Sequence, residues 1–352
     1  MTCGRWFWRW VGLTVLAVAP AVFGRAAEPR PVKAVVVSMF EIGEDTGDIP
    51  GEFQLWVERG GFDEKLEFSL GWRHLWWRDD GVLLVCTGGG VTNATATIMA
   101  LGQDPRFDLS RAYWLVAGIA GADPADCSLG SAAWAEWVVD GDLAYEIDAR
   151  EMPANWPYGF IALGAHEPDT LEDGWTVETI AYRLNPALVR WAFELTKDVK
   201  IADDPELAAF RAQFAEVYPQ AARPPFVLIG DSLGSSTYWH GEKLNTWANA
   251  WMKLHTGGAA NFVMSNMEDN GTLTALHRLA KTGLVDTDRV LVLRTASNFS
   301  TPPPGRDAGW STTAPYPAQG LPAKESAYHV TKVVLDALLA DWATVAETPP
   351  GR

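Results

Sequence analysis

A Met-Glu pair lies in the polar segment Ser265-Asn266-Met267-Glu268-Asp269-Asn270-Gly271, which precedes a small, apolar stretch of helical composition. The carboxylate of Glu268 has two alternative roles. It either caps the N-terminus of that helix, where negative charge is favourable, or it accepts two hydrogen bonds from vicinal hydroxyls, which is what a ribose offers.

Two glycine-rich segments follow apolar runs that are typical of buried strands. The segment 87–94 (TGGGVTNA) opens a stretch of helical composition, so its free backbone amides could receive an anion or a ribose hydroxyl. The segment 118–121 (GIAG) holds the same place after its own strand. Tight packing is the alternative for both, because neither matches a Walker loop or a dinucleotide fingerprint. The candidate ligand-binding residues here are Gly89, Gly90, Asn93, Gly118 and Gly121.

The segment 230–233 (GDSL) spells the signature of the GDSL esterases directly after an apolar run. Such an enzyme has this Ser near the mature N-terminus and a DxxH motif near the C-terminus. Here Ser232 lies beyond mid-chain and no His has an Asp three residues before it, so Ser232 lacks a base. We therefore expect a pocket wall, with the esterase as a third alternative. Asp231 could accept a hydrogen bond from a ligand, and Tyr238 and Trp239 could stack on a base.

Composition argues against other classes of function. The chain has 352 residues and a net charge of −16, which repels phosphodiester backbones, so we expect no nucleic-acid partner. Its six His are scattered without a pair at ligand spacing, so we expect no protein-held metal and no cofactor. Cys86 and Cys127 are expected to be buried free thiols, the alternative being a disulfide formed in an oxidising periplasm.

Residues 1–26 are predicted to be a secretory signal peptide. Arg5 and Arg9 precede the apolar run 11–23, and small residues follow it. The run is short for a helix that crosses a bilayer, but flanking aromatic residues keep an uncleaved membrane anchor as the alternative. The expected location is therefore secreted or periplasmic, with residues 27–352 forming a single domain.

Strands and helices alternate along that domain. The expected strands are 33–39, 82–86, 112–117, 134–140, 226–229, 261–264 and 290–293, and the expected helices are 92–101, 186–196, 205–218, 245–255, 270–282 and 325–342. This alternation predicts an α/β sheet with helices on both faces. Ligands bind such sheets beyond the carboxyl ends of the strands, where the candidate segments and Asn298 are expected. The Pro- and Gly-rich segment 301–323 is long enough to form a flap there.

Four motifs in order resemble the nucleoside phosphorylases and nucleosidases. They are GGGVTNATATIMAL, LVAGIAGADPADCSLGS, SNMEDNGTLTAL and VLVLRTASNFS. Within that group the sequence is most similar to the purine nucleoside permease family. The resemblance implies a three-layer αβα sandwich with a mixed central sheet, and a purine nucleoside as ligand.

The resemblance also implies roles for single residues. Met267 and Glu268 match the pair that holds ribose, with Glu268 on the 2′- and 3′-hydroxyls. Asn298 stands where many nucleosidases have an Asp that protonates the departing purine, and an amide cannot deliver that proton. Glu41 or Glu44 would position the attacking water, the alternative being an acidic surface loop.

The phosphate ligands of the phosphorylases are replaced in this sequence. An Arg and a Ser bind phosphate there, and Val116 and Ile119 stand at the matching positions. We therefore predict cleavage of the N-glycosidic bond by water, with phosphate as a less favoured co-substrate. The alternative is a non-catalytic protein that captures nucleosides for a separate membrane transporter. A homo-oligomer is left open, because the phosphorylases form dimers, trimers or hexamers.

Overall fold

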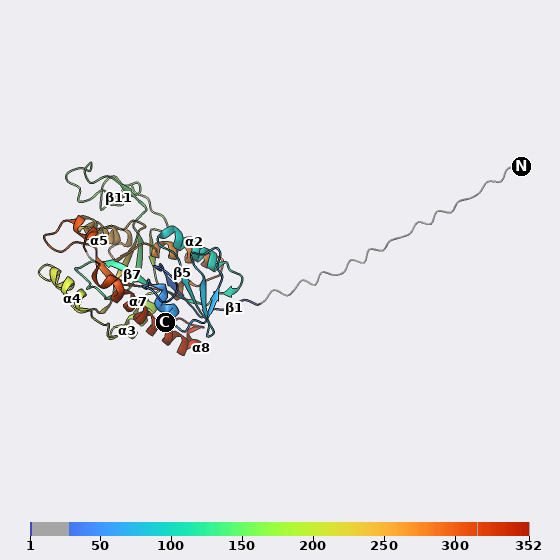
Figure 1. Ribbon diagram of the computed structural model, residues 1–352. Coiled ribbons are helices and arrows are strands. Elements are labelled where there is room, and N and C mark those ends of the chain that lie inside the picture. The colour runs from blue at the N-terminus through green and yellow to red at the C-terminus, as the bar shows by residue number, and fades with distance from the viewer. Residues whose placement is uncertain (2–27, 315, 352) are drawn as a thin grey trace.

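A twelve-stranded mixed sheet forms the centre of the computed structural model, which describes residues 1, 28–314 and 316–351 (Figure 1). The predicted signal peptide lies outside the described residues, apart from Met1. The strands of the sheet are β2 (Ala34–Ser38), β3 (Glu64–Leu66), β4 (Leu75–Arg78), β5 (Val82–Cys86), β7 (Tyr113–Ala122), β8 (Ala132–Trp134), β9 (Trp137–Asp140), β12 (Ala181–Arg183), β13 (Val227–Ile229), β14 (Asp231–Gly234), β15 (Phe262–Asn266) and β16 (Val290–Phe299).

Strand β7 lies at the middle of this sheet and organises it. The order β12-β9-β14-β15-β7-β2-β5-β4-β3 forms the main path, and β16 pairs with β7 and β8 while β13 pairs with β8. Strands β2 and β16 run parallel to β7, whereas β15 runs antiparallel to it. The sheet is therefore mixed, as the family resemblance implied.

Helices cover the sheet on both sides, which makes an αβα sandwich (Figure 1). Helices α2 (Val91–Gly102) and α5 (Glu242–Thr256) lie on one side, with α6 (Asp269–Ala280) packed against α2. Helices α3 (Pro186–Thr196), α7 (Leu321–Ala340) and α8 (Trp342–Val345) lie on the other. The remaining helices are α1 (Phe53–Arg59), α4 (Pro205–Arg211), η1 (Ala212–Phe214), η2 (Thr287–Arg289), η3 (Ala308–Thr312) and η4 (Pro317–Gly320). Within the described residues, no helix combines the length and apolarity needed to cross a membrane.

Local sequence explains why the best-predicted elements form where they do. Every residue of β2 and β5 is buried, as expected for runs rich in β-branched side chains at the centre of a sheet. Helix α3 begins at Pro186, and the side chain of Asn185 accepts hydrogen bonds from the amides of Ala187 and Leu188. The observed bounds of β5 and α3 are those predicted.

Other predicted elements need correction. The segment 118–121 does not follow its strand but belongs to it, because β7 continues through it and pairs with β16 up to Asn298. The segment 134–140 is divided between β8 and β9, and 205–218 is helical only to Phe214. Asp231 does not end a strand but begins β14. The differences in the strands arise from pairing between distant segments, which local patterns do not record.

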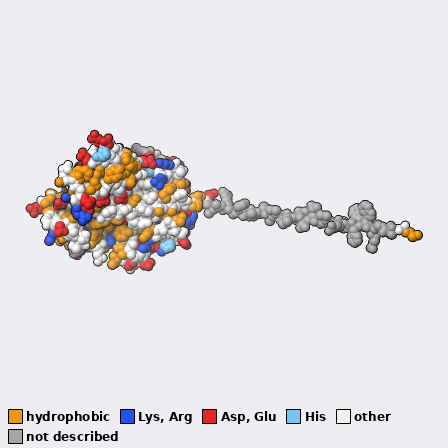
Figure 2. Space-filling view, turned by 90° about the horizontal axis from the view of Figure 1, so that it is seen from above, with side chains coloured by type: hydrophobic (Ala, Val, Ile, Leu, Met, Phe, Trp, Pro, Cys, Tyr) orange, Lys and Arg blue, Asp and Glu red, His pale blue; other side chains and the backbone are white. Residues whose placement is uncertain are grey.

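Two smaller sheets lie beside the main one. Strand β1 (Arg30–Pro31) pairs in parallel with β6 (Phe107–Asp108), and β10 (Ala144–Glu146) pairs antiparallel with β11 (Phe160–Ala162). The hairpin of β10 and β11 projects from the body of the molecule (Figure 1). On the face in Figure 2, Lys and Arg side chains are scattered among acidic and apolar ones.

Both cysteines in the described part of the chain are free and buried, as predicted. Burial raises the pKa of each thiol to about 12. Neither thiol is therefore ionised at neutral pH, so neither is poised as a nucleophile.

Candidate functional site

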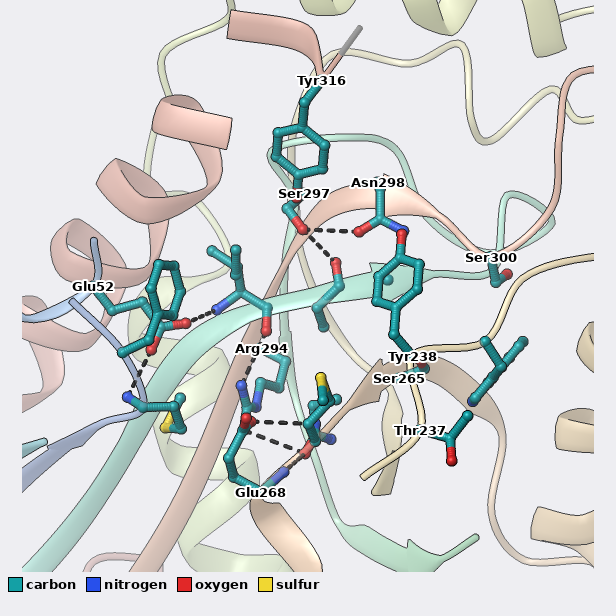
Figure 3. A pocket seen from close by; sticks show the side chains of 18 residues that line it. Glu52, Thr237, Tyr238, Ser265, Glu268, Arg294, Ser297, Asn298, Ser300 and Tyr316 are labelled. Atoms are coloured by element: carbon teal, nitrogen blue, oxygen red, sulfur yellow. Dashed lines mark hydrogen bonds and ion pairs between the residues drawn. The ribbon is translucent and has the colours of Figure 1, made fainter. Parts of the chain in front are cut away.

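A pocket opens at the carboxyl ends of β2, β7, β15 and β16, where the sequence placed it (Figure 3). Met39 and Phe40 follow β2, and Gly121 lies near the end of β7. Further walls come from the loop after β14, from Glu52 before α1, and from Tyr316 in the segment 301–323. Chain segments far apart in the sequence thus meet around one pocket.

Glu52 is a buried acid at one end of the pocket. One of its carboxylate oxygens accepts a hydrogen bond from the amide of Met39 at 2.7 Å, and the other accepts one from the amide of Ile119 at 2.7 Å. Burial raises the pKa of Glu52 to about 7; the charge of Glu268 adds to the rise, whereas Arg294 opposes it. Glu52 is therefore half-protonated near neutral pH, the state in which a general base is most useful.

Glu268 lies on the same wall, and its carboxylate is held from two directions. Oε2 accepts from the guanidinium of Arg294 at 3.1 Å, and Oε1 accepts from the amide of Gly90 at 3.3 Å. The residue is 6% exposed and directly precedes α6. Glu268 thus stands at the N-cap position of α6, but its side chain makes no capping hydrogen bond to the helix and faces the pocket instead.

Arg294 lies between the two glutamates and is itself buried (Figure 3). Its Nε and Nη2 donate to the carboxylate of Asp269 at 3.0 and 2.6 Å, and its Nη1 donates to the carbonyl of Ile119 at 3.0 Å. Burial alone would lower the pKa of Arg294, but the charges of Asp269 and Glu268 raise it. The guanidinium therefore stays charged. We call Glu52, Glu268, Asp269 and Arg294 the carboxylate end.

The opposite end of the pocket is neutral and aromatic. We call Tyr238, Trp239, Asn298 and Tyr316 the aromatic end. Asn298 Nδ2 donates to the hydroxyl of Tyr238 at 3.0 Å, and its Oδ1 accepts from the hydroxyl of Ser297 at 3.1 Å. Burial raises the pKa of Tyr316 to about 12, so this phenol stays protonated.

Most of the predicted sugar- and base-binding residues are brought together here. Met267, Glu268, Gly121, Tyr238, Trp239 and Asn298 all line the pocket. Gly118 lies just behind it. A Cβ on Gly118 would lie 2.0 Å from Met39 Cε and 2.5 Å from Glu52 Oε1. A glycine is thus required for β7 to approach the acid so closely.

Glu41 and Glu44, predicted to position water, lie outside the pocket lining. The Glu41 carboxylate accepts from the amides of Gly51 and Gln54, so it holds the start of α1. Glu44 is exposed in the loop. The acid that reaches the pocket is Glu52, whose amide donates to the carbonyl of Phe40 and returns the chain to the end of β2.

The predicted places of Asp231 and Ser232 at the pocket are also wrong, because both side chains are enclosed by protein groups. Asp231 accepts hydrogen bonds from the amides of Glu136, Trp137 and Asn261, and so ties β14 to its neighbours. The Ser232 hydroxyl is fully buried and donates to Asp269 at 2.8 Å. With neither solvent nor a His beside it, Ser232 is no esterase nucleophile.

The glycine-rich segment before α2 contributes less than predicted. Gly89 and Asn93 lie outside the pocket lining, and Asn93 Nδ2 donates to the carbonyl of Gly89. The amide of Gly90 is engaged by Glu268, and the amide of Val91 by the hydroxyl of Ser236. Both amides therefore already have protein partners and are not free to bind an anion.

The two residues that stand at the phosphate-binding positions of the phosphorylases, Val116 and Ile119, occupy different places. Ile119 lines the pocket, whereas Val116 is buried in the core between β2 and β16. Among the described lining residues, Arg294 is the one Lys or Arg, and it is bound by two carboxylates. In the described part of the chain, no three His, Cys, Asp or Glu side chains cluster in a way that could hold a metal.

Comparison with protein families shows which family the chain belongs to. Residues 31–349 match the model of the purine nucleoside permease family, NUP, which covers nearly the whole described chain. The chain belongs to the purine nucleoside permease family. The resemblance seen in four ordered motifs is thereby confirmed.

Individual relatives of this purine nucleoside permease family member are similar over part of their length. A probable purine nucleoside permease of Schizosaccharomyces pombe is 34% identical over 223 residues, which are 60% of this chain and 63% of that protein. A purine nucleoside permease of Candida albicans is 36% identical over 229 residues, which are 64% of this chain and 55% of that protein. The matches thus span less than two thirds of these curated relatives.

Solved structures similar to this family member share its fold. Futalosine hydrolase of Helicobacter pylori superposes with a TM-score of 0.53 at 14% identity, over 87% of this chain and 98% of that one. A methylthioadenosine/S-adenosylhomocysteine nucleosidase from Colwellia psychrerythraea gives 0.52 at 14% identity, over 87% and 95%. The fold is therefore that of the nucleoside phosphorylases and hydrolases.

Glu52, Arg294 and Tyr316 are the functional candidates that sequence reasoning missed. A signal for Arg294 exists, because it is the one charged residue in the apolar strand sequence VLVLRTASNF. A charge in a buried strand requires a partner, and that partner marks a site. Glu52 and Tyr316 carry no comparable signal, since both reach the pocket through long loops.

Proposed function

We propose that this member of the purine nucleoside permease family binds purine nucleosides and cleaves their N-glycosidic bond with water. The observation that carries the proposal is the pair of buried carboxylates, Glu52 and Glu268, which face one pocket on either side of Arg294. Two acids in different environments can take two different tasks in one reaction.

Glu268 would hold the sugar. Its two carboxylate oxygens can accept hydrogen bonds from the vicinal hydroxyls of a ribose, and such charge-assisted bonds are among the stronger ones. Arg294 and Gly90 fix the carboxylate in advance, so little reorganisation is needed when the sugar arrives. Met267, next along the chain, would pack against the ribose ring.

Glu52 would position and deprotonate the attacking water. Its pKa of about 7 leaves a large ionised fraction at neutral pH while keeping its basicity high. The carboxylates also stabilise the positive charge that develops on the ribose as the bond to the base breaks. Glu52 thereby replaces Glu41 and Glu44 as the residue for this role.

Asn298 would hold the departing base, while Tyr238, Trp239 and Tyr316 offer aromatic faces on which it can stack. The amide of Asn298 can hydrogen-bond the edge of a purine but has no acidic proton to give. Hydrolysis is favoured over phosphorolysis, because a phosphate dianion would meet two carboxylates and an already paired Arg294.

Base release from inosine, guanosine and adenosine tests the proposal. The purified full chain, Glu52→Gln and Glu44→Gln are incubated with each nucleoside, and free base is measured by chromatography. We expect release by the unaltered chain and by Glu44→Gln, whose exposed acid lies outside the pocket lining, and strongly reduced release by Glu52→Gln. Absence of free base with all three nucleosides contradicts the enzymatic proposal.

The second candidate is capture of nucleosides without turnover, which the neutral Asn298 favours. A protein exported by its predicted signal peptide would bind the nucleoside and pass it to a separate membrane transporter. This alternative predicts binding of inosine in calorimetry with no base released, and loss of nucleoside uptake when the gene is deleted. Uptake that survives the deletion contradicts it.

A further inference from the structure

We propose that the pocket is adapted to nucleosides whose base carries a positive charge, such as a 7-alkylated purine nucleoside or an N-ribosylpyridinium. The inference rests on the proposed function, because it concerns the base that leaves when the N-glycosidic bond breaks. It goes further by naming a substrate class.

The first reason is the absence of a proton donor where the base would leave. Around the aromatic end, the described lining offers only amide, hydroxyl and indole groups, such as those of Asn298, Ser297 and Trp239. Burial raises the pKa of both tyrosines there, Tyr238 and Tyr316, and with it the cost of giving up a proton. A neutral purine needs a proton to leave easily, but a cationic base leaves as a neutral molecule and needs none.

The second reason is the placement of charge. Two carboxylates and one guanidinium line the pocket, and the guanidinium is already held by Asp269, which is fully buried. Lys324, whose ammonium also interacts with Glu52, donates to the carbonyl of Pro50 at 2.6 Å and lies outside the lining. The excess of negative charge therefore lies at the carboxylate end of the pocket. In the described lining, no cation lies where the base would bind.

This placement favours the transition state over the bound substrate. In a cationic nucleoside the charge begins on the base and passes to the ribose as the bond breaks. Because the carboxylates lie at the sugar end, they attract the charge more strongly after it has moved, and this difference accelerates the reaction. The aromatic faces of Tyr238, Trp239 and Tyr316 contribute binding through cation–π contact with a flat cationic ring.

The reaction balances without a further reagent. The bond between C1′ and the base nitrogen breaks, and its electron pair neutralises the charge on the base. An oxygen of water bonds to C1′, and Glu52 accepts the proton that this water loses. The products are ribose, a neutral base and one proton, which Glu52 returns to solvent.

Guanosine and 7-methylguanosine form a matched pair for the test, at a pH at which the methylated ring is cationic. We expect kcat/KM of the full chain to be on the order of 10² or more higher for 7-methylguanosine, the typical contribution of a missing general acid. Equal values overturn the inference but leave the proposed function standing. No release of base from either nucleoside overturns both.

Two variants of Asn298 link the preference to that residue. Asn298→Asp introduces an acid, so guanosine should gain more than 7-methylguanosine and the ratio of their kcat/KM values should fall about tenfold or more. Asn298→Ala, which serves even if the Asp variant does not fold, should widen the ratio, because only guanosine loses a hydrogen bond at N7. The control Gln103→Glu converts an exposed amide far from the pocket lining and should leave the ratio unchanged. A ratio that neither variant moves contradicts the inference.

Discussion

The carboxylate end and the aromatic end of the pocket are built in opposite ways. Glu52, Glu268 and Arg294 are exposed by 6% or less, and each makes hydrogen bonds to backbone or charged groups. Tyr238 and Tyr316, by contrast, are 62% and 43% exposed as whole residues, although their hydroxyls lie against Asn298 and Ser297. Under the proposed function, this contrast between a fixed, charged wall and an open, neutral wall predicts that the site specifies the sugar more strictly than the base.

The difference has a cause in the fold. In the carboxylate end, Arg294 lies in β16 and Glu268 directly precedes α6. Glu52 ends a loop, but its carboxylate is fixed by the amides of Met39 and Ile119, and β7 approaches it closely at Gly118. Tyr238 follows β14 in a loop, and Tyr316 lies in a segment where Ala318 and Gln319 have positive φ angles. Rigid elements hold reacting groups more accurately than loops do, which suits a catalytic wall better than a binding wall.

Replacing Glu52 tests the contrast between the two ends of the pocket most directly. We expect Glu52→Gln to lower kcat for base release by ~10²–10⁴, because the water loses its general base. In the unaltered chain, kcat/KM should rise with pH through about 7 as Glu52 ionises, and the variant should lack this rise. A pH profile shared by both proteins would contradict the assignment.

The stability of the carboxylate end should depend on pH through the same group. Folding raises the pKa of Glu52 from 4.5 to about 7, so between these values the folded chain keeps a proton that the unfolded chain has lost. The free energy of unfolding should therefore fall as pH rises through this window, by up to about 3 kcal/mol from this group. Urea unfolding at pH 5 and pH 8 should show a smaller fall in Glu52→Gln, and an equal fall would refute the shift.

Replacing Glu268 tests whether the carboxylate end recognises the sugar strictly. Glu268→Gln should raise KM for inosine by ~10–100-fold, because hydrogen bonds to a charged group contribute about 1.5–3 kcal/mol. The same variant should bind 2′,3′-dideoxyinosine as the unaltered chain does, since that ligand has no hydroxyls for Glu268. A similar loss for both ligands would indicate a general disruption of the pocket instead.

If the base is recognised loosely, a substitution at the aromatic end should have only a small effect on substrate binding. Tyr238→Leu is expected to raise KM only ~3–10-fold, the effect of losing one aromatic contact of about 0.5–1.5 kcal/mol, with little change in kcat. Tyr145→Leu removes another exposed tyrosine, in β10, and provides the control. A large fall in kcat for Tyr238→Leu would place this side chain in the catalytic step.

Much of this comparison could be predicted from sequence. Met267, Glu268 and Asn298 stand in local motifs that follow apolar runs, so their nearness to strands could be predicted. Their meeting in one pocket could not, because β15 is antiparallel to β7 whereas β16 is parallel to it. The extension of β16 to Phe299 could not be predicted in this way, because the segment after Leu293 is polar and its strand geometry comes from pairing with β7.

Glu52 shows why some residues of the site could not be predicted from the sequence. Among the acids after β2, Glu41 is next to the strand but turns to the amide of Gln54, and the acid that faces the pocket comes eleven residues later. That choice depends on how the loop closes, through the hydrogen bond from the amide of Glu52 to Phe40. Loop closure is a tertiary event, so residue type and spacing do not determine it.

The identity of the sugar product tests the central claim most directly, namely that the carboxylate end directs water to the glycosidic bond. Guanosine is incubated with the full chain in buffer that contains phosphate, and the sugar released with guanine is identified by mass spectrometry. We predict ribose, in an amount independent of the phosphate concentration. Ribose 1-phosphate as the product, or no release of guanine at all, would contradict the account.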